Sequence, residues 1–209
     1  MGNKVLIIED HPLLRAGLKA LLGDIDPGIV PLEASTLGEG RRLVAAHPDI
    51  ALVVLDLHLP DSPSDESWRT LRSASPGLPV LVTSAGEDPA LARRLLAEGA
   101  MGFLPKSASM RTVRAAIGLV LGGEVYVPPF LVGGGGMVAA CSLTPRQREV
   151  AKALCQGLSN QQIAERLGLS ENTVRVHVSA VLRAAEAESR RDVPRLSAAL
   201  GLAEFRRAR

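Results

Sequence analysis

The sequence predicts an α/β unit built on a doubly wound, five-stranded parallel sheet, followed by an all-α unit of four helices. Five short apolar runs alternate with helical patterns through residue 121, which is typical of a parallel sheet covered on both faces. Glycine and proline then interrupt the pattern, and only helical periodicity follows. We therefore expect units at residues 1–121 and 142–209, joined by a Gly/Pro-rich linker at residues 122–141.

The strands and helices of the first unit follow one another in pairs. Residues 5–8 form an apolar, β-branched strand, and residues 13–22 repeat leucine at helical spacing. The later pairs, strand first, are residues 29–34 and 37–46, 50–55 and 66–72, 79–82 and 89–98, and 100–104 and 109–121. Sheets of this kind bind ligands beyond the carboxyl ends of their strands, so a site is expected there.

Residue types that favour helix ends mark the second unit. Thr144 and Ser159 each stand three residues before a glutamine, which is the pattern of a capping box. Gly168 suits the left-handed residue that ends a helix, and Ser170 suits the cap of the next helix. Two helices joined by such a tight turn make a helix-turn-helix.

Charge is divided unevenly between the two units. Residues 1–121 carry 12 basic and 14 acidic residues, whereas residues 141–209 carry 12 basic and 7 acidic residues. The basic excess favours nucleic acid, or another anionic surface, as the partner of the second unit. The longest strongly apolar run, residues 50–55, is far shorter than the roughly 18 residues of a membrane helix. With no signal-peptide pattern, we expect a cytoplasmic protein that has no membrane partner.

Charged and hydroxyl side chains stand at the ends of four predicted strands. Glu9 and Asp10 follow the first strand, and Asp56 follows the third, its expected neighbour in the sheet. Ser84 ends the fourth strand, and Lys106 follows the fifth. Each has an ordinary structural explanation on its own, such as a helix cap or a solvated loop residue. Together they predict one cleft whose carboxylates need a cation, and oxygen ligands with open water positions suit Mg²⁺.

This set of residues predicts phosphoryl transfer to a carboxylate. Asp56 is the candidate nucleophile, because it stands alone after the central strand. Mg²⁺ held by Glu9, Asp10 and Asp56 neutralises charge on the incoming phosphoryl oxygens. Lys106 supplies a fixed cation, and Ser84 supplies a hydrogen bond that can draw its loop inward once the phosphoryl group is present.

Residues 1–121 resemble a two-component receiver domain, which has a flavodoxin-like fold. The motifs that carry the resemblance are Ile8-Glu9-Asp10-His11-Pro12, Leu55-Asp56-Leu57-His58-Leu59-Pro60, Val82-Thr83-Ser84-Ala85 and Phe103-Leu104-Pro105-Lys106. The resemblance implies that Asp56 accepts phosphate from a sensor histidine kinase and that the His58 backbone carbonyl is a further Mg²⁺ ligand. It also implies a cis peptide at Pro105-Lys106, and a switch aromatic, Phe103, whose rotamer follows Ser84. The resemblance also assigns Ser84 rather than Thr83 as the switch hydroxyl, because Ala85 follows Ser84 as in the Ser/Thr-Ala step of the family.

Two features depart from the receiver pattern. The first acidic residue is Glu9, where aspartate is commoner, although the longer side chain still reaches a metal. Residues 62–67 replace the usual glycine-rich turn with serine, proline and acidic residues. This turn motivates an alternative, in which the receiver serves dimerisation or ligand sensing and phosphorylation is not required.

Residues 143–200 resemble the LuxR-type helix-turn-helix. The matching stretches are Leu143-Thr144-Pro145-Arg146-Gln147-Arg148-Glu149-Val150, Gly157-Leu158-Ser159-Asn160-Gln161-Gln162-Ile163-Ala164 and Leu169-Ser170-Glu171-Asn172-Thr173-Val174-Arg175-Val176-His177-Val178. With the receiver in front, the whole chain resembles a NarL/FixJ-family response regulator.

A helical wheel separates a core face from an exposed face in the predicted recognition helix. Val174, Val178 and Val181 fall on the core stripe, and His177 lies at its edge, where a structural role or a backbone-phosphate contact is expected. Arginine suits guanine, and Val176 suits a thymine methyl group, in the major groove. The candidate DNA-binding residues are Ser170, Asn172, Thr173, Arg175, Val176, Ser179 and, for phosphate, Arg183.

The sequence therefore predicts a DNA-binding transcription regulator, not an enzyme, that is switched by phosphorylation of Asp56. Its expected partners are double-stranded DNA, a sensor histidine kinase and, when active, a second copy of the chain. Without the phosphoryl group, the receiver is expected to mask the DNA-binding helix or to leave the chain monomeric. A haloacid-type phosphatase is the enzyme alternative, but His58 stands where that class places its second catalytic acid.

Overall fold

The structure is a computed structural model, which describes residues 3–62, 64–132, 143–184 and 187 of the 209. Five strand–helix pairs form the α/β unit. They are β1 (Lys4–Ile8), α1 (Pro12–Ile25), β2 (Val30–Ala34), α2 (Leu37–Ala46), β3 (Ile50–Asp56), α3 (Ser64–Ala74), β4 (Val80–Ser84), α4 (Pro89–Ala97), β5 (Gly102–Pro105) and α5 (Met110–Leu121). Further along the chain lie α6 (Pro129–Val132), α7 (Pro145–Cys155), α8 (Asn160–Leu167) and α9 (Glu171–Ala184).

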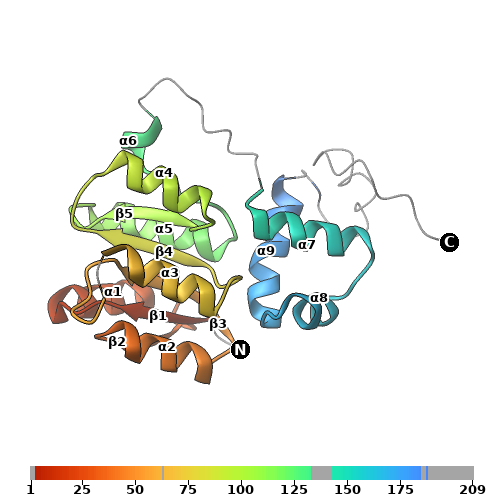
Figure 1. The fold of residues 1–209 in the computed structure, drawn as a ribbon, viewed down its shortest axis with the longest axis horizontal. Helices are drawn as coiled ribbons and strands as arrows, with labels where there is room; N and C mark the ends of the chain where they lie inside the picture. The colour runs from red at the N-terminus through yellow and green to blue at the C-terminus, as the bar shows by residue number, and fades with distance from the viewer. Residues whose placement is uncertain (1–2, 63, 133–142, 185–186, 188–209) are drawn as a thin grey trace.

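The predicted doubly wound sheet is confirmed. Its five parallel strands have the order β2-β1-β3-β4-β5, so β1 and β3 are neighbours. Apolar side chains of α1 and α5 pack on one face, and those of α2, α3 and α4 pack on the other (Figure 1). Every residue of β3 is buried, as its unbroken apolar run predicts for the centre of such a sheet. The element ends differ from prediction by at most three residues, and the largest difference is at the end of α1.

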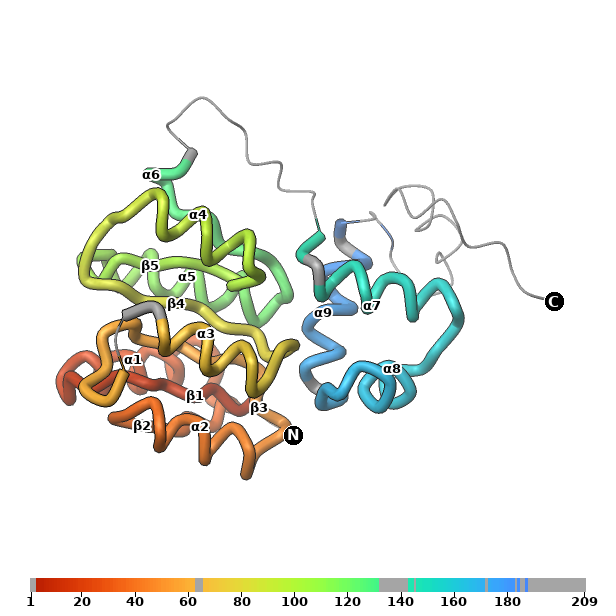
Figure 2. Tube along the Cα trace, viewed as in Figure 1, coloured from red at the N-terminus to blue at the C-terminus, as the bar shows by residue number. Residues whose placement is uncertain are grey.

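Residues 124–132, which we expected to belong to the linker, pack against the α/β unit. The Tyr126 amide donates a hydrogen bond to the Met101 carbonyl at 2.9 Å, and Tyr126 forms a parallel bridge with Gly102. Leu131 of α6 is buried in the same apolar cluster as Ala92 and Leu95 of α4. Figure 2 shows α6 beside α4. Residues 133–141 of the predicted linker lie outside the described residues.

The helical unit begins with the expected capping boxes. The Thr144 hydroxyl accepts a hydrogen bond from the Gln147 amide, and the Gln147 side chain accepts one from the Thr144 amide. Ser159 and Gln162 repeat the arrangement at α8. Gly168 ends α8 in the left-handed region, with φ of 64°. The predicted fourth helix lies outside the described residues.

The expected cis peptide is wrong, because no peptide bond within the described part of the chain is cis. Pro105 instead continues β5, with its Cα opposite that of Ser84 in β4.

Candidate functional site

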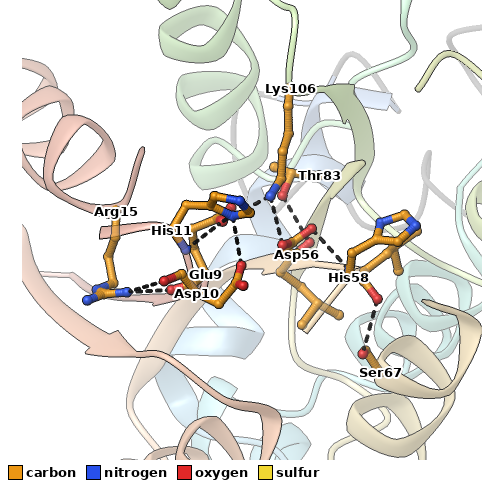
Figure 3. Close-up of polar contacts among 11 residues, drawn as sticks. Glu9, Asp10, His11, Arg15, Asp56, His58, Ser67, Thr83 and Lys106 are labelled. Atoms are coloured by element: carbon orange, nitrogen blue, oxygen red, sulfur yellow. Dashed lines mark hydrogen bonds and ion pairs between the residues drawn. The ribbon is translucent and has the colours of Figure 1, made fainter. Parts of the chain in front are cut away.

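The predicted site residues meet at the carboxyl ends of four strands. Glu9 and Asp10 follow β1, Asp56 ends β3 and Lys106 follows β5 (Figure 3). Ser84 ends β4. This convergence follows from strand order, because a parallel sheet brings the ends of neighbouring strands to one edge. The chain therefore places three carboxylates, one hydroxyl and one ammonium around the same edge.

Lys106 joins two of the carboxylates. Its Nζ lies 2.7 Å from Asp56 Oδ2 and 2.9 Å from Glu9 Oε1. Burial opposes the charge on the lysine, but hydrogen bonds from its ammonium to Asp56 and Glu9 outweigh that effect and raise its pKa. The ammonium therefore stays charged at neutral pH and offsets the repulsion between Asp56 and Glu9.

Asp56 is fully buried and held at both carboxylate oxygens. Oδ1 accepts a hydrogen bond from the His58 amide at 3.1 Å, and Oδ2 receives the Lys106 ammonium. The Leu57 amide donates to the Thr83 carbonyl at 3.1 Å, which ties the turn after Asp56 to β4. An ionised carboxylate fixed in this way is suited to attack an electrophile that enters from the strand-end edge.

The acidic cluster has donor atoms suited to a metal ion. Ligand atoms of Glu9, Asp10, His11 and Asp56 lie within 4.8 Å of one another. Glu9 Oε2 is buried without a hydrogen-bond partner, whereas Asp10 Oδ1 accepts no hydrogen bond but lies 2.8 Å from His11 Nδ1. Buried carboxylate oxygens that lack partners are costly, and a hard divalent cation such as Mg²⁺ satisfies them. The residues present therefore fit the metal that the sequence predicts.

His11 is a member of this cluster that the sequence reasoning did not single out. Its Nδ1 lies 2.9 Å from Glu9 Oε1 and 2.8 Å from Asp10 Oδ1. The hydrogen bond to Glu9, followed by the negative charge of Asp10, raises the pKa of His11. Its position directly after the acidic pair was the available indication, but a single exposed histidine has no metal-ligand spacing.

The two hydroxyls at the end of β4 are held differently. Thr83 Oγ1 donates a hydrogen bond to the Leu55 carbonyl at 3.3 Å, within the sheet. Ser84 is buried beside the site, and its carbonyl accepts a hydrogen bond from the Lys106 amide at 2.7 Å. Engagement of Thr83 with β3 supports the assignment of Ser84 as the hydroxyl that faces a phosphoryl group.

The atypical turn after Asp56 has structural contacts of its own. Asp61 accepts hydrogen bonds from the Leu37 and Gly38 amides, both at 2.9 Å, and so caps the start of α2. The Ser67 hydroxyl donates to the Leu57 carbonyl at 3.4 Å (Figure 3). These contacts fasten the turn to the α/β unit and leave the carboxylate of Asp56 in place.

The predicted recognition helix, α9, lies against the opposite edge of the same sheet (Figure 1). Thr173 Oγ1 donates a hydrogen bond to the carbonyl of Ile50, the first residue of β3, at 3.4 Å. His177 Nε2 lies 3.0 Å from the carbonyl of Gly77, which precedes β4. Gln147 Nε2 of α7 donates to the Gly123 carbonyl at 2.9 Å. The α/β unit therefore covers the side of α9 that carries Thr173 and His177.

This docking corrects the expected exposure of α9. Val176 is only 6% exposed, although the wheel placed it on the open face, because α9 packs against residues around Gly123. Thr173 is likewise buried, and the Ser170 hydroxyl accepts a hydrogen bond from the Thr173 amide as a helix cap. Arg175 and Ser179 are exposed, as expected. Arg175 lies 3.4 Å from Glu171, and the side chains of Asn172 and Arg183 lie outside what the structure describes.

His177 is the polar centre of this interface. It is 2% exposed, and its Nδ1 has no hydrogen-bond partner. Burial, assisted by the positive charges of Arg146 and Arg72 and opposed by the hydrogen bond to Gly77, lowers the pKa of His177 to about 4. The docked arrangement therefore requires a neutral imidazole. A structural role for His177 was one of the two roles expected from the sequence. In the structure, His177 has this role at the contact between the two units, and not inside the helical unit.

Two family models match the chain. The response regulator receiver domain matches residues 5–118, and the luxR family of bacterial regulatory proteins matches residues 141–197. The chain is 33% identical to the glycerol metabolism activator of Pseudomonas putida, with 86% of this chain and 88% of that protein covered. It is 32% identical to the nitrate/nitrite response regulator protein NarL of Escherichia coli K12, with 89% of this chain and 90% of that protein covered.

Solved structures support the same fold. A two-component response regulator of the LuxR family from Aurantimonas sp. SI85-9A1 is similar, with 28% identity and a TM-score of 0.56. That match covers 63% of this chain and 94% of the other. RcsB dimers bound to DNA match with 18% identity and a TM-score of 0.56, over 96% of this chain and 100% of the other. Across the described residues, no helix is long and apolar enough to cross a membrane.

Proposed function

The chain belongs to the NarL/FixJ-family response regulators, which are two-component transcription regulators, and from that premise we propose that phosphorylation of Asp56 controls DNA binding by α9. The observation that carries the proposal is the pairing of a buried, lysine-linked Asp56 at one sheet edge with a covered α9 at the other. The matched families and relatives are regulators, so the phosphatase alternative is rejected. DNA as the partner implies a cytoplasmic site of action.

The residues around Asp56 have separate roles in the proposed transfer. An Asp56 carboxylate oxygen attacks the phosphorus and forms the new P–O bond, the P–N bond of a kinase phosphohistidine breaks, and the departing imidazole takes up a proton from solvent. Glu9, Asp10, Asp56 and the His58 carbonyl would hold Mg²⁺, which would neutralise charge on the phosphoryl oxygens. Lys106 remains charged beside the phosphoryl group on Asp56, and the Ser84 hydroxyl donates a hydrogen bond to a phosphoryl oxygen.

The covered α9 is the proposed inactive state. Val176 and Thr173 cannot contact DNA while the α/β unit buries them. Phosphorylation shifts the population toward chains in which α9 is free, and these pair as a dimer on two half-sites. We propose that the first domain spans residues 1–121 and the second spans residues 142–209. Residues 124–132 lie between these bounds, in the predicted linker, and pack on the first domain.

Intact-mass analysis tests the phosphoacceptor. Acetyl phosphate with Mg²⁺ is expected to add one phosphoryl group, and EDTA is expected to prevent the addition. If no phosphoryl group is added while the chain still binds DNA specifically, the phosphorylation-independent alternative is correct.

Arg175 is expected to read a base. Arg175→Ala should cost on the order of 1–3 kcal/mol at the cognate site, measured on the phosphorylated chain, and should relax preference at one position. Arg148→Ala is a matched control, because it removes the same charge from an exposed site on α7. Equal weakening on all DNA sequences would make Arg175 a phosphate contact instead.

Acidification is expected to release α9. His177 has a pKa of about 4 when docked and an ordinary value near 6.5 when free, so the undocked state binds the extra proton. Docking is therefore complete above about pH 6.5 and weakens as pH falls toward 4. Between about pH 7.5 and 5.5, we expect the unphosphorylated chain to gain about tenfold in DNA affinity. His177→Gln should lose this gain, and an equal gain in that variant would contradict the role of His177.

A further inference from the structure

We propose that Phe130, in α6, is a positioning residue that responds to the ring of Phe103 and so connects the phosphorylation site to the segment leading to the helical unit. The inference rests on the proposed function, because it concerns the response of the chain to phosphorylation of Asp56. It assigns a role to residues 126–132, which the sequence predicted only as part of a linker.

The two rings make direct contact. Their centroids are 6.1 Å apart, and their planes are nearly perpendicular, at 87°. Phe103 is fully buried in β5, where its Cα lies opposite that of Val82, two residues before Ser84 in β4. Edge-to-face contact depends on orientation, so a turn of the Phe103 ring changes the surface on which Phe130 rests.

The segment around Phe130 is fixed on the same part of the sheet. Tyr126 extends the backbone pairing beyond β5 through its hydrogen bond to Met101. A Cβ at Gly102 would lie only 3.1 Å from Tyr126 Cβ and 3.3 Å from the Tyr126 carbonyl oxygen. Leu131, 3% exposed, packs in the apolar cluster that includes Phe103 and Leu95 of α4. Residues 126–132 thus follow the position of β5 closely.

The phosphorylation site and the docked α9 lie at opposite edges of the sheet, so a change at Asp56 needs a path to α9. Asp56 lies at the carboxyl end of β3, and Thr173 of α9 contacts Ile50 at its other end. Every residue of β3 between them is buried and tightly packed, so this strand has little room to move. The segment at residues 126–132 instead contacts Phe103 through Phe130, whose side chain is partly exposed. Movement of Ser84 can therefore reach residues 126–132 through Phe103 and Phe130, and this segment precedes the helical unit in the sequence.

Fluorine NMR tests the contact in the full chain. The sequence contains three phenylalanines, Phe103, Phe130 and Phe205, so 4-fluorophenylalanine gives three signals that leucine substitutions assign. We expect acetyl phosphate with Mg²⁺ to shift the Phe103 and Phe130 signals together. A shift of Phe103 with no change at Phe130 would overturn the inference.

Three variants test the consequence for DNA binding. Phe130→Leu keeps an apolar side chain but removes the ring, and we expect it to take up the phosphoryl group normally. Its gain in DNA affinity on phosphorylation should fall by about threefold or more relative to wild type. Phe130→Tyr keeps the ring and should restore the gain. Val127→Ala, a loss of partly buried apolar volume in the same cluster, controls for general loosening and should retain most of the gain.

The outcomes separate this inference from the function on which it rests. If the wild-type chain gains no phosphoryl group, or gains it without a change in DNA affinity, the proposed function fails and the inference fails with it. If wild type responds in both assays and Phe130→Leu responds equally, only the inference is overturned.

Discussion

Asp56→Asn is expected to abolish phosphoryl uptake and, with it, any change in DNA affinity when acetyl phosphate and Mg²⁺ are added. The carboxamide is a poor nucleophile, and it removes one of the two negative charges that face Lys106. Asparagine has nearly the shape of aspartate, so the fold around β3 should be retained. Intact mass and a DNA-binding titration on the same sample measure both effects.

Asp61→Asn is the matched control for this variant. Asp61 is exposed five residues later in the same turn, and its side chain caps α2 rather than facing Lys106. We expect one phosphoryl group to be added to this control, as to wild type. Full uptake by Asp56→Asn would show that another residue accepts the phosphoryl group.

Gly123→Ala is expected to free α9 without phosphorylation. A Cβ at Gly123 would lie 2.1 Å from the carbonyl oxygen of Val176, which is backbone within α9 and cannot move aside alone. The two units can relieve this overlap only by separating. Apparent DNA affinity rises with the fraction of chains that are competent to bind, so we expect the unphosphorylated variant to bind DNA about tenfold more tightly than wild type, or tighter still.

The chain offers a control for the strain that alanine adds at a left-handed residue. Gly123 has φ of 86° and Gly157 has φ of 78°, but nothing lies within 4 Å of a Cβ built at Gly157. Gly157→Ala should therefore lose a similar amount of stability, of the order of 1 kcal/mol, without freeing α9. Equal DNA affinity in Gly123→Ala and wild type would mean that the docked arrangement does not limit binding.

The sheet and its acidic edge were predictable because their causes are local or periodic. The apolar run at residues 50–55 specifies a buried central strand, and parallel pairing then brings Asp56 next to the residues after β1. The capping boxes at Thr144 and Ser159 are similarly local, since each joins residues three apart. The signals for these features are present within a few residues of sequence.

The docking of α9 was only partly predictable. The helical wheel separates one buried face from one open face, and it cannot show that a second surface covers the open one. Val176 is therefore buried where exposure was expected, and nothing local to Gly77 or Gly123 marks them as contact points. The position of Phe130 on Phe103 likewise depends on tertiary packing, because a short proline-flanked segment has no periodic pattern.

The most direct test of the central claim is the DNA affinity of one preparation of the full chain, measured before and after stoichiometric phosphorylation that intact mass has verified. Release of α9 predicts about tenfold or tighter binding once the phosphoryl group is on Asp56. Unchanged affinity in fully phosphorylated chain would contradict the account, because Asp56 would then have no influence on α9.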